Sequence, residues 1–327
     1  MRGLSIAFAG LVVAAVCATA TAAPAPNGLI AYHEFDQNGN PQIWVVAADG
    51  TGQTQITTTD GEAPNWSSDG QRIYFDSDRL DYHGHVHIFS MKPDGSDVQQ
   101  VTNSDGFDGF PAVSPDGTKL AYDFSNDEVP GVQGIWLAAI DGSGAHQITH
   151  SPIPRAHEFD YDSNPDFGPN GWIAFQRVRG NCPPDRCNRK GAVAFQSSIW
   201  IVREDGTGLR RLVSGGKIWG DPGWSPDGTK VVLHTYDEGR GRASSADIYV
   251  MNADGTKLHP LTHTGKDEVS YTPEWSPDGT KIVFHHISFS DDHAEIWQMN
   301  PDGSNQQKIA SCSELTFCDF ANWGRRP

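Results

Sequence analysis

The chain has 327 residues with 35 glycines, 21 prolines and a hydrophobic fraction of 37%, a composition typical of a turn-rich globular protein rather than a disordered one. Its formal net charge of -17 argues against nucleic acid and anionic membrane surfaces as partners, because like charges repel. The ten tryptophans need a sizeable core to bury their side chains.

Residues 1–22 predict a cleaved secretory signal peptide. An arginine at position 2 precedes an apolar run from Leu4 to Ala18, and small residues at positions 20–22 form a cleavage site. The run is short for a membrane span, and no second apolar stretch follows it. We therefore expect a secreted or periplasmic monomer without a membrane span, in which residues 27–327 form a single domain.

Two turn motifs recur along the rest of the chain. The first, SPDG or a close variant, ends at glycines roughly 50 residues apart, namely Gly70, Gly117, Gly171, Gly228 and Gly279. Proline presets φ, aspartate caps the turn backbone and glycine accepts a positive φ, so this motif suits a tight turn. The second motif is an Asp-Gly pair that follows a strand-like segment and begins at Asp49, Asp94, Asp141, Asp205, Asp254 and Asp302.

Each repeat contains segments that are typical of four β-strands. Short β-branched and aromatic segments such as IVF at 282–284 follow the first turn, and segments such as IYVM at 248–251 precede the second. A further short strand ends each unit, for example QIT at 147–149. Because no segment after the signal has a helical apolar period, we predict an all-β fold, a six-bladed β-propeller of four-stranded blades.

The two ends of the chain predict how this ring closes. The N-terminal part supplies segments typical of strands two to four of one unit, LIAYHE, QIWVVA and TQIT, but no first strand. The C-terminal FANWG at 320–324 is similar to the first-strand sequence APNWS at 63–67. We therefore expect one blade to be built from both chain ends, which removes the free sheet edges.

The stretch WSPDGTKIVF at 275–284, together with IYVMNADGTKLHPLT at 248–262, resembles the PD40 (WD40-like) repeat of the TolB family. The resemblance covers nearly all of the chain after residue 27 and implies the propeller fold. TolB itself has an additional α/β domain before its propeller, and prolyl-oligopeptidase relatives add a hydrolase domain after theirs. Here the propeller begins at about residue 27 and the chain stops at Pro327, so we expect neither the Tol-system role nor the peptidase role.

The long and varied loops of such a ring gather at one end, where sites are usually built. The position that follows the last apolar residue of the second strand is polar in every unit, and the repeat predicts matching heights for these side chains near the loops. They are His33, Asp76, Asp123, Gln176, His234 and His285. One interpretation is a site for a ligand, a divalent metal or acid–base chemistry. The other is that they cap strand ends by bonding to loop backbone.

A second resemblance bears on the metal interpretation. Oligogalacturonate lyases are propellers of the same repeat type and hold a metal with His and Gln side chains. That resemblance supports the metal interpretation, in which His33, Gln176, His234 and His285 hold manganese, zinc or calcium. Such a metal would neutralise a uronate carboxylate and make the neighbouring proton more acidic. A basic loop at 176–198 contains Arg177, Arg179 and Lys190, which would steer an anionic polysaccharide.

Four cysteines remain once the signal peptide is removed. An even number in an exported chain favours disulfides, and proximity in the sequence predicts the pairs Cys182–Cys187 and Cys312–Cys318. Their spacings do not match common zinc signatures.

The chain contains no nucleophile elbow, HExxH, P-loop or Rossmann motif. We therefore predict an exported binding scaffold for a cell-envelope or extracellular protein or glycan, with no cofactor established. The alternative is a metal-dependent, polysaccharide lyase-like enzyme with its site on the loop-rich face.

Overall fold

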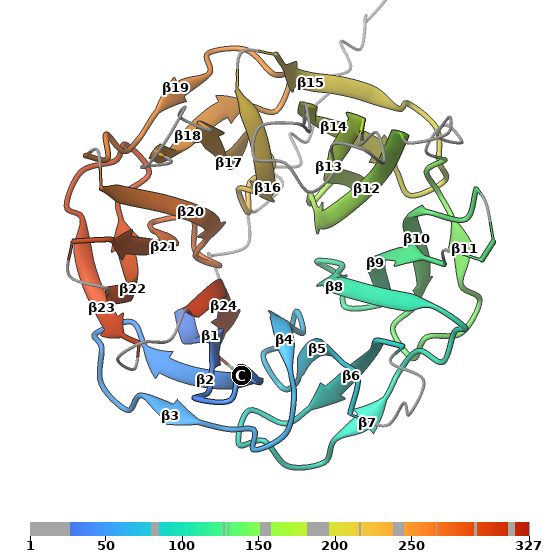
Figure 1. The fold of residues 1–327 in the computed structure, drawn as a ribbon, viewed down its shortest axis with the longest axis horizontal. Helices are drawn as coiled ribbons and strands as arrows, with labels where there is room; N and C mark the ends of the chain where they lie inside the picture. The colour runs from blue at the N-terminus through green and yellow to red at the C-terminus, as the bar shows by residue number, and fades with distance from the viewer. Residues whose placement is uncertain are drawn as a thin grey trace, which may run out of the picture.

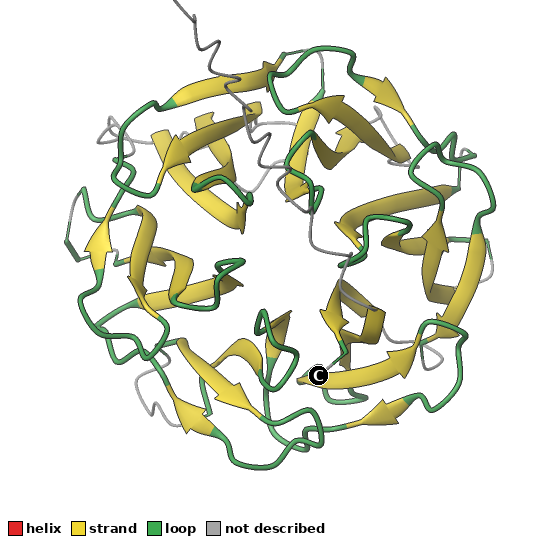
Figure 2. Ribbon diagram, turned by 180° about the vertical axis from the view of Figure 1, so that it is seen from behind, coloured by secondary structure: helices red, strands yellow, loops and turns green. Residues whose placement is uncertain are grey.

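The computed structural model describes residues 27–79, 85–126, 128–129, 131–150, 158–181, 196–215, 217–237, 245–265, 267–290, 293–312 and 318–326. Within these ranges every regular element is a β-strand, and the sheets stand in a ring around a common centre (Figures 1 and 2). The predicted all-β propeller arrangement is thereby confirmed. No helix with the length and apolar character of a membrane span occurs in the described part of the chain.

Four of the sheets have four strands each, all paired antiparallel. The first contains β24 (Cys318–Arg325), β1 (Asn27–Phe35), β2 (Pro41–Ala47) and β3 (Thr54–Gln55). The second contains β4 (Glu62–Trp66), β5 (Ile73–Ser77), β6 (His87–Met91) and β7 (Gln99–Gln100). The third contains β8 (Phe107–Val113), β9 (Lys119–Ser125), β10 (Gly134–Ala139) and β11 (His146–Gln147). The fourth contains β12 (Glu158–Phe167), β13 (Trp172–Asn181), β14 (Gln196–Arg203) and β15 (Arg210–Ser214).

The fifth sheet is larger than the sequence predicts. Its strands are β16 (Ile218–Trp224), β17 (Lys230–Asp237), β18 (Ser245–Asn252), β19 (His259–Pro260), β20 (Glu268–Trp275), β21 (Ile282–Ser288), β22 (His293–Met299) and β23 (Gln307–Ser311). They form two consecutive antiparallel meanders, and one parallel pairing between Ala246 and Val269 joins β18 to β20. Instead of six separate blades, the structure therefore shows four four-stranded sheets and one continuous sheet.

The last strand closes the ring by pairing with the first. Strand β24 lies antiparallel to β1, with Trp323 opposite Ile30 and Asn322 opposite Ala31. A disulfide joins Cys312, just after β23, to Cys318 at the start of β24, so the predicted Cys312–Cys318 pair is confirmed. Because β23 belongs to the preceding sheet, this bridge fastens the closing strand to its neighbour. The other predicted pair, Cys182–Cys187, lies outside the described residues.

The SPDG turns owe their shape to bonds within the motif. In the copy at 225–228, the Ser225 hydroxyl donates to Oδ1 of Asp227 at 2.6 Å, and the Thr229 amide donates to the same oxygen at 3.0 Å. Gly228 has a φ of +68°, and its amide donates to the Ser225 carbonyl at 2.8 Å. A side chain at position 228 would also approach Pro169 of the neighbouring sheet within 2.7 Å. Glycine is therefore required by both conformation and space.

The core is a series of contacts between neighbouring sheets. One cluster packs Val232 and Ile248 of the β16–β19 meander against Trp275 and Phe284 of the β20–β23 meander. Another packs Ala31 and Ile43 against residues of β4 and β5, including Trp66 and Phe75. Each sheet thus buries both faces against its neighbours, so the interior is distributed around the ring.

Phe284→Ala should destabilise the protein by about 3 to 5 kcal/mol, because Phe284 is 1% exposed and its removal leaves a cavity between two meanders. Phe289→Ala is the matched control, since Phe289 is 46% exposed and should cost little. Chemical denaturation followed by tryptophan fluorescence measures both. Equal effects of the two substitutions would contradict this account of the core.

Candidate functional site

The innermost strand of each four-stranded meander carries the same backbone irregularity. These inner strands are β4, β8, β12, β16, β20 and β24, and each pairing with its neighbour contains a register shift. At the shift one non-glycine residue has a positive φ, at Ala63, Phe110, Asn164, Asp221, Thr272 and Phe320. Such conformations are costly for residues with side chains, and strain of this kind concentrates at functional sites. The six bulges therefore indicate that the candidate functional site lies at the centre of the ring.

The six predicted polar residues lie directly beside these bulges. Each is paired in register with the residue that precedes a positive-φ position: Asp76 with Glu62, Asp123 with Gly109, Gln176 with Ser163, His234 with Gly220, His285 with Tyr271, and His33 with Asp319. The structure therefore places them at equivalent heights around the centre. We call these six residues the polar ring.

Three members of the polar ring bond to backbone of the next sheet. The Phe110 amide donates to Oδ2 of Asp76 at 2.8 Å. The amide of Ala63 donates to Nδ1 of His33, and that of Thr272 to Nδ1 of His234, both at 3.4 Å. In every case the donor is a positive-φ residue. At these three positions the structural interpretation applies, because the side chain holds the neighbouring bulge.

Burial keeps the imidazoles of the polar ring neutral. It lowers the pKa of His33 to about 3 and the pKa of His285 well below its usual range. Burial also lowers the pKa of His234, partly opposed by Asp221 at 3.3 Å. Desolvation disfavours the charged form of every ionisable group.

The same burial favours the protonated form of the carboxyl groups. It raises the pKa of Asp76 and of Asp319 to about 7, and that of Asp123 well above its usual range. The centre of the ring is therefore polar without carrying the full negative charge that its composition suggests.

The four proposed metal ligands come from successive meanders. The Tyr271 ring lies between His234 and His285, with centroid distances of 6.1 Å and 4.5 Å. Among the residues that the structure describes, no group of three or more His, Cys, Asp or Glu side chains could hold a metal ion. The predicted metal, which includes Gln176 among its ligands, stays a prediction.

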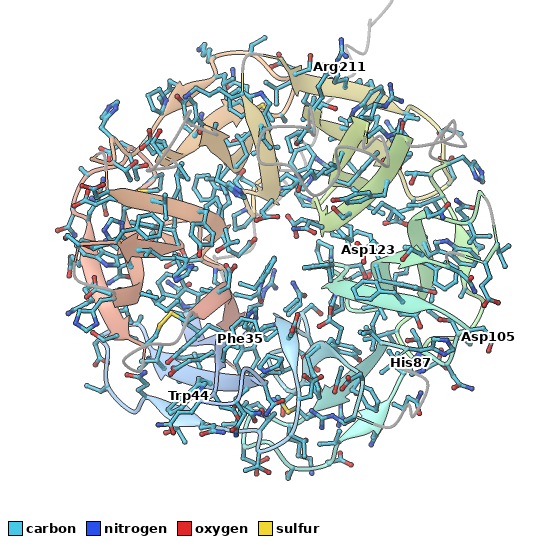
Figure 3. All side chains as sticks on the ribbon, in the orientation of Figure 1. Phe35, Trp44, His87, Asp105, Asp123 and Arg211 are labelled. Atoms are coloured by element: carbon cyan, nitrogen blue, oxygen red, sulfur yellow. A yellow bond between two sulfur atoms is a disulfide. The ribbon has the colours of Figure 1, made fainter. Side chains whose placement is uncertain are left out.

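A cavity of about 720 Å³ occupies one end of the ring centre. Three members of the polar ring line it, Asp123, Gln176 and His234. Figure 3 shows Asp123, which belongs to β9, on the inner side of the ring. The inner strands add eight aromatic or acidic groups, namely Phe107, Phe110, Asp160, Tyr161, Asp162, Asp221, Asp319 and Phe320. The cavity therefore gathers residues from strands that are distant in sequence.

Two phenylalanines from bulges on either side of the β4–β7 sheet meet at the wall of this cavity. Phe110 of β8 and Phe320 of β24 contact each other with ring centroids 5.2 Å apart. Their strands belong to sheets separated by the β4–β7 sheet, so the rings reach over Ala63, the smallest of the positive-φ residues. Beside them Thr272 donates to Oδ1 of Asp319 at 2.8 Å, and Asn164 donates to Asp221.

The prediction that arginines of the basic loop steer an anion is corrected for Arg177. Arg177 is 5% exposed, and its Nε and terminal nitrogen bond both oxygens of Asp162 at 2.5 and 2.7 Å. Its charge is neutralised in the interior, so it does not suit a steering role. Arg179 is half exposed but pairs with Asp160 at 2.6 Å. Lys190 lies outside the described residues.

Sequence reasoning missed Asp221, Asp319, Phe110 and Phe320. A signal for them was present, because five of the six positive-φ residues stand immediately before a proline. A proline in an otherwise strand-like segment indicates a bulge or an edge. The bulged strand packs tightly against the polar ring at Gly220, because a Cβ there would lie 2.6 Å from Cε1 of His234.

Asp76→Asn should make the protein's stability less dependent on pH. Because burial raises the pKa of Asp76 to about 7, the folded state binds a proton that the unfolded state loses near pH 4. The stabilisation of the folded state by this proton is fully present below about pH 4 and is lost as the pH rises through 7. Asn keeps an acceptor for Phe110, so the variant should gain up to about 4 kcal/mol over the wild type at pH 8 relative to pH 4. Denaturation at both pH values measures this, and an unchanged difference would contradict it.

With the site described, comparison with known proteins gives the family. The family model of the TolB β-propeller domain matches residues 11–181 and 189–319. An uncharacterised protein of Agrobacterium fabrum is 26% identical over 267 residues, covering 68% of this chain and 83% of that protein. A TolB homologue of Chlorobium luteolum is 29% identical over 166 residues, covering 50% of this chain but only 31% of its own length.

Solved structures agree at the level of the fold. TolB from Acinetobacter baumannii has a TM-score of 0.67 at 17% identity, covering 91% of this chain and 67% of that one. An oligogalacturonate lyase in complex with manganese has a TM-score of 0.51 at 15% identity, covering 88% and 74%. Because the family model covers most of the sequence, this chain belongs to the TolB β-propeller domain family.

Proposed function

We propose that this protein is an exported binding scaffold that takes a protein or cell-envelope glycan into the cavity at the centre of the ring. We further propose that the fold counts as six four-stranded blades, with the larger fifth sheet taken as two blades joined by one bridge. The observation that carries the proposal is the 720 Å³ cavity lined from β8, β9, β12, β13, β16, β17, β20 and β24. Concave sites with a few convergent polar groups are where proteins usually bind ligands.

The hydrogen bonds of the polar groups that line the cavity support a binding role. His234 is engaged with a neighbouring bulge, and Asp319 and Asp221 are held by Thr272 and Asn164. These bonds fix the wall of the cavity before any ligand arrives, which lowers the entropic cost of binding. Export rests on the predicted signal peptide at residues 1–22, which lie outside the described residues.

The lyase alternative has electrostatics against it. Five aspartates line the cavity, and among its described lining residues no lysine or arginine is available to pair with a polyuronate carboxylate. The metal that such a lyase needs can be measured directly. A binding scaffold predicts no stoichiometric manganese, zinc or calcium in protein purified without chelator or nickel, by elemental mass spectrometry. One equivalent that is lost on His234→Ala or His285→Ala would favour the enzyme instead.

Filling the cavity tests the binding proposal. Ser125 is a half-buried residue that lines the cavity at the end of β9, so Ser125→Trp should obstruct it. Ser290→Trp is the control, because Ser290 is exposed between β21 and β22 and does not line the cavity. The wild type should bind at least one member of a panel of peptides and envelope glycans, and Ser125→Trp should bind it at least about tenfold more weakly.

Two outcomes would count against the proposal. Loss of binding in the Ser290→Trp control but not in Ser125→Trp would place the binding surface outside the cavity. The absence of binding to any member of the panel by the folded wild type would remove the support for a scaffold altogether.

A further inference from the structure

The outer edge of the fourth sheet carries a basic patch in an otherwise acidic protein. The chain has a formal net charge of -17, yet four exposed cations lie on or beside the end of β14, the strand β15 and the start of β16. They are Arg203, Arg210, Arg211 and Lys217, and we call them the basic edge. Figure 3 shows Arg211 on the outside of the ring. None of the four lines the central cavity.

The repeat shows that this edge differs from its counterparts in the other sheets. Arg211 lies opposite Trp200 in register, and the residues at the same position in β3, β7 and β11 are glutamines. Trp172 lies opposite Arg203, at a position that Lys230 takes in the next meander. The fold forms with uncharged residues at most of these outer positions. Variation on a rigid scaffold is where binding surfaces usually arise.

Each cation of the basic edge lies over an aromatic ring. The pairs are Arg203 and Arg210 over Trp172, Arg211 over Trp200, and Lys217 over Tyr249, at 4.3, 5.7, 6.0 and 4.7 Å from the ring centroids. Ring faces attract guanidinium and ammonium groups. The contact restricts long side chains that would otherwise sample many rotamers, so less conformational entropy is lost when a ligand binds them. The cations are thus positioned while they remain exposed.

The protein's own carboxyl groups leave the basic edge available to an anion. None of its four members forms an ion pair within the described part of the chain. Glu204 pairs instead with Lys119 of the preceding sheet. Asp205 and Asp254 lie within electrostatic range, but each accepts hydrogen bonds mainly from the threonine two residues further on. The guanidinium groups therefore retain donors for a ligand.

The shape and composition of this edge favour a short protein segment as the anion. β15 is the last strand of its sheet, so the successive side chains of Arg210 and Arg211 project to opposite sides of the sheet edge. Leu209 is 42% exposed immediately before them, and it offers an apolar contact. A long polyanion suits the edge less, because its ends would lie against the surface of a chain with a net charge of -17.

We propose that the basic edge docks a short acidic segment of a partner protein. Carboxylates of the segment accept hydrogen bonds from Arg203, Arg210 and Arg211, because the planar guanidinium matches the carboxylate. An apolar side chain of the segment packs against Leu209, and Lys217 adds positive charge beyond the end of β15. This surface is separate from the cavity, so the inference goes beyond the proposed function and does not depend on it.

The probe is a capped pentapeptide in which a leucine lies between two pairs of glutamates. Its neutral match has glutamine in place of every glutamate. Calorimetric titration into the purified protein at low salt should show that the glutamate peptide binds at least about tenfold more tightly than the glutamine peptide. Raising the salt to about 0.5 M should weaken the binding of the glutamate peptide, because exposed charges are then screened within a few ångströms.

The variants compare two equivalent outer positions. Arg210→Gln and Arg211→Gln should each weaken binding of the glutamate peptide about threefold, and the double variant about tenfold. Glutamine already occupies the position of Arg211 in three other sheets, so the fold should tolerate it. Lys308→Gln is the matched control. Lys308 lies opposite Trp297 on β23, but its charge pairs with Glu295 at 3.0 Å, so its loss should change the affinity less than about twofold.

Several outcomes would overturn the inference. Equal binding of the two peptides, or no weakening in the double variant, would show that the basic edge does not recognise carboxylates. Equal weakening by Lys308→Gln and Arg211→Gln would leave only general electrostatic attraction. Tighter binding of a polyuronate than of the peptide would replace the protein segment by a glycan, and a dimer that only the double variant disrupts would replace it by a second copy of the chain.

The Ser125→Trp variant separates this inference from the proposed function. It obstructs the cavity and should leave binding of the glutamate peptide unchanged. If it abolishes that binding, the peptide occupies the cavity and the inference fails. If it abolishes binding of another ligand while the glutamate peptide does not bind the wild type, the scaffold function stands and this inference alone fails.

Discussion

The hydrogen bond between a bulged inner strand and a polar side chain of the preceding sheet is the contact on which the centre of this molecule depends. Phe110 and Asp76 show it most clearly, with the amide of one donating to the carboxyl of the other at 2.8 Å. The bond holds a residue in a positive-φ conformation that would otherwise be unfavourable. It also joins two neighbouring sheets.

The bulge decides which side chains reach the centre. In a regular strand side chains alternate between the two faces of the sheet, and neither set would point along the axis of the ring. The extra residue turns one side chain per inner strand toward the centre. Phe110 and Phe320 therefore meet, and Asp221 and Thr272 reach the cavity wall. The same bulges therefore hold the strained backbone and supply side chains to the cavity wall.

A centre built this way contains ionisable groups that are poorly hydrated. Asp123 and Asp319 favour protonation and His33 favours neutrality, since burial penalises the charged form of each. The members of the TolB β-propeller domain family share the ring, but the residues at its centre are set by the individual sequence. Similarity of fold at 17% identity therefore says little about what a given member binds, and the site has to be read from its own side chains.

The sequence by itself determined the repeating turns, the all-β class, the closing strand and the Cys312–Cys318 bridge, because each depends on residues that are near one another or on a repeated local pattern. It also located His33, Asp76 and the rest of the polar ring, since the repeat places them at equivalent positions. Only the tertiary structure decided that Arg177 forms an ion pair with Asp162, that β18 joins β20 in one sheet, and that Asp160 and Asp319 line the same cavity. These facts depend on which side chains meet across separate strands, and no local pattern records the distance between groups that are far apart in the chain.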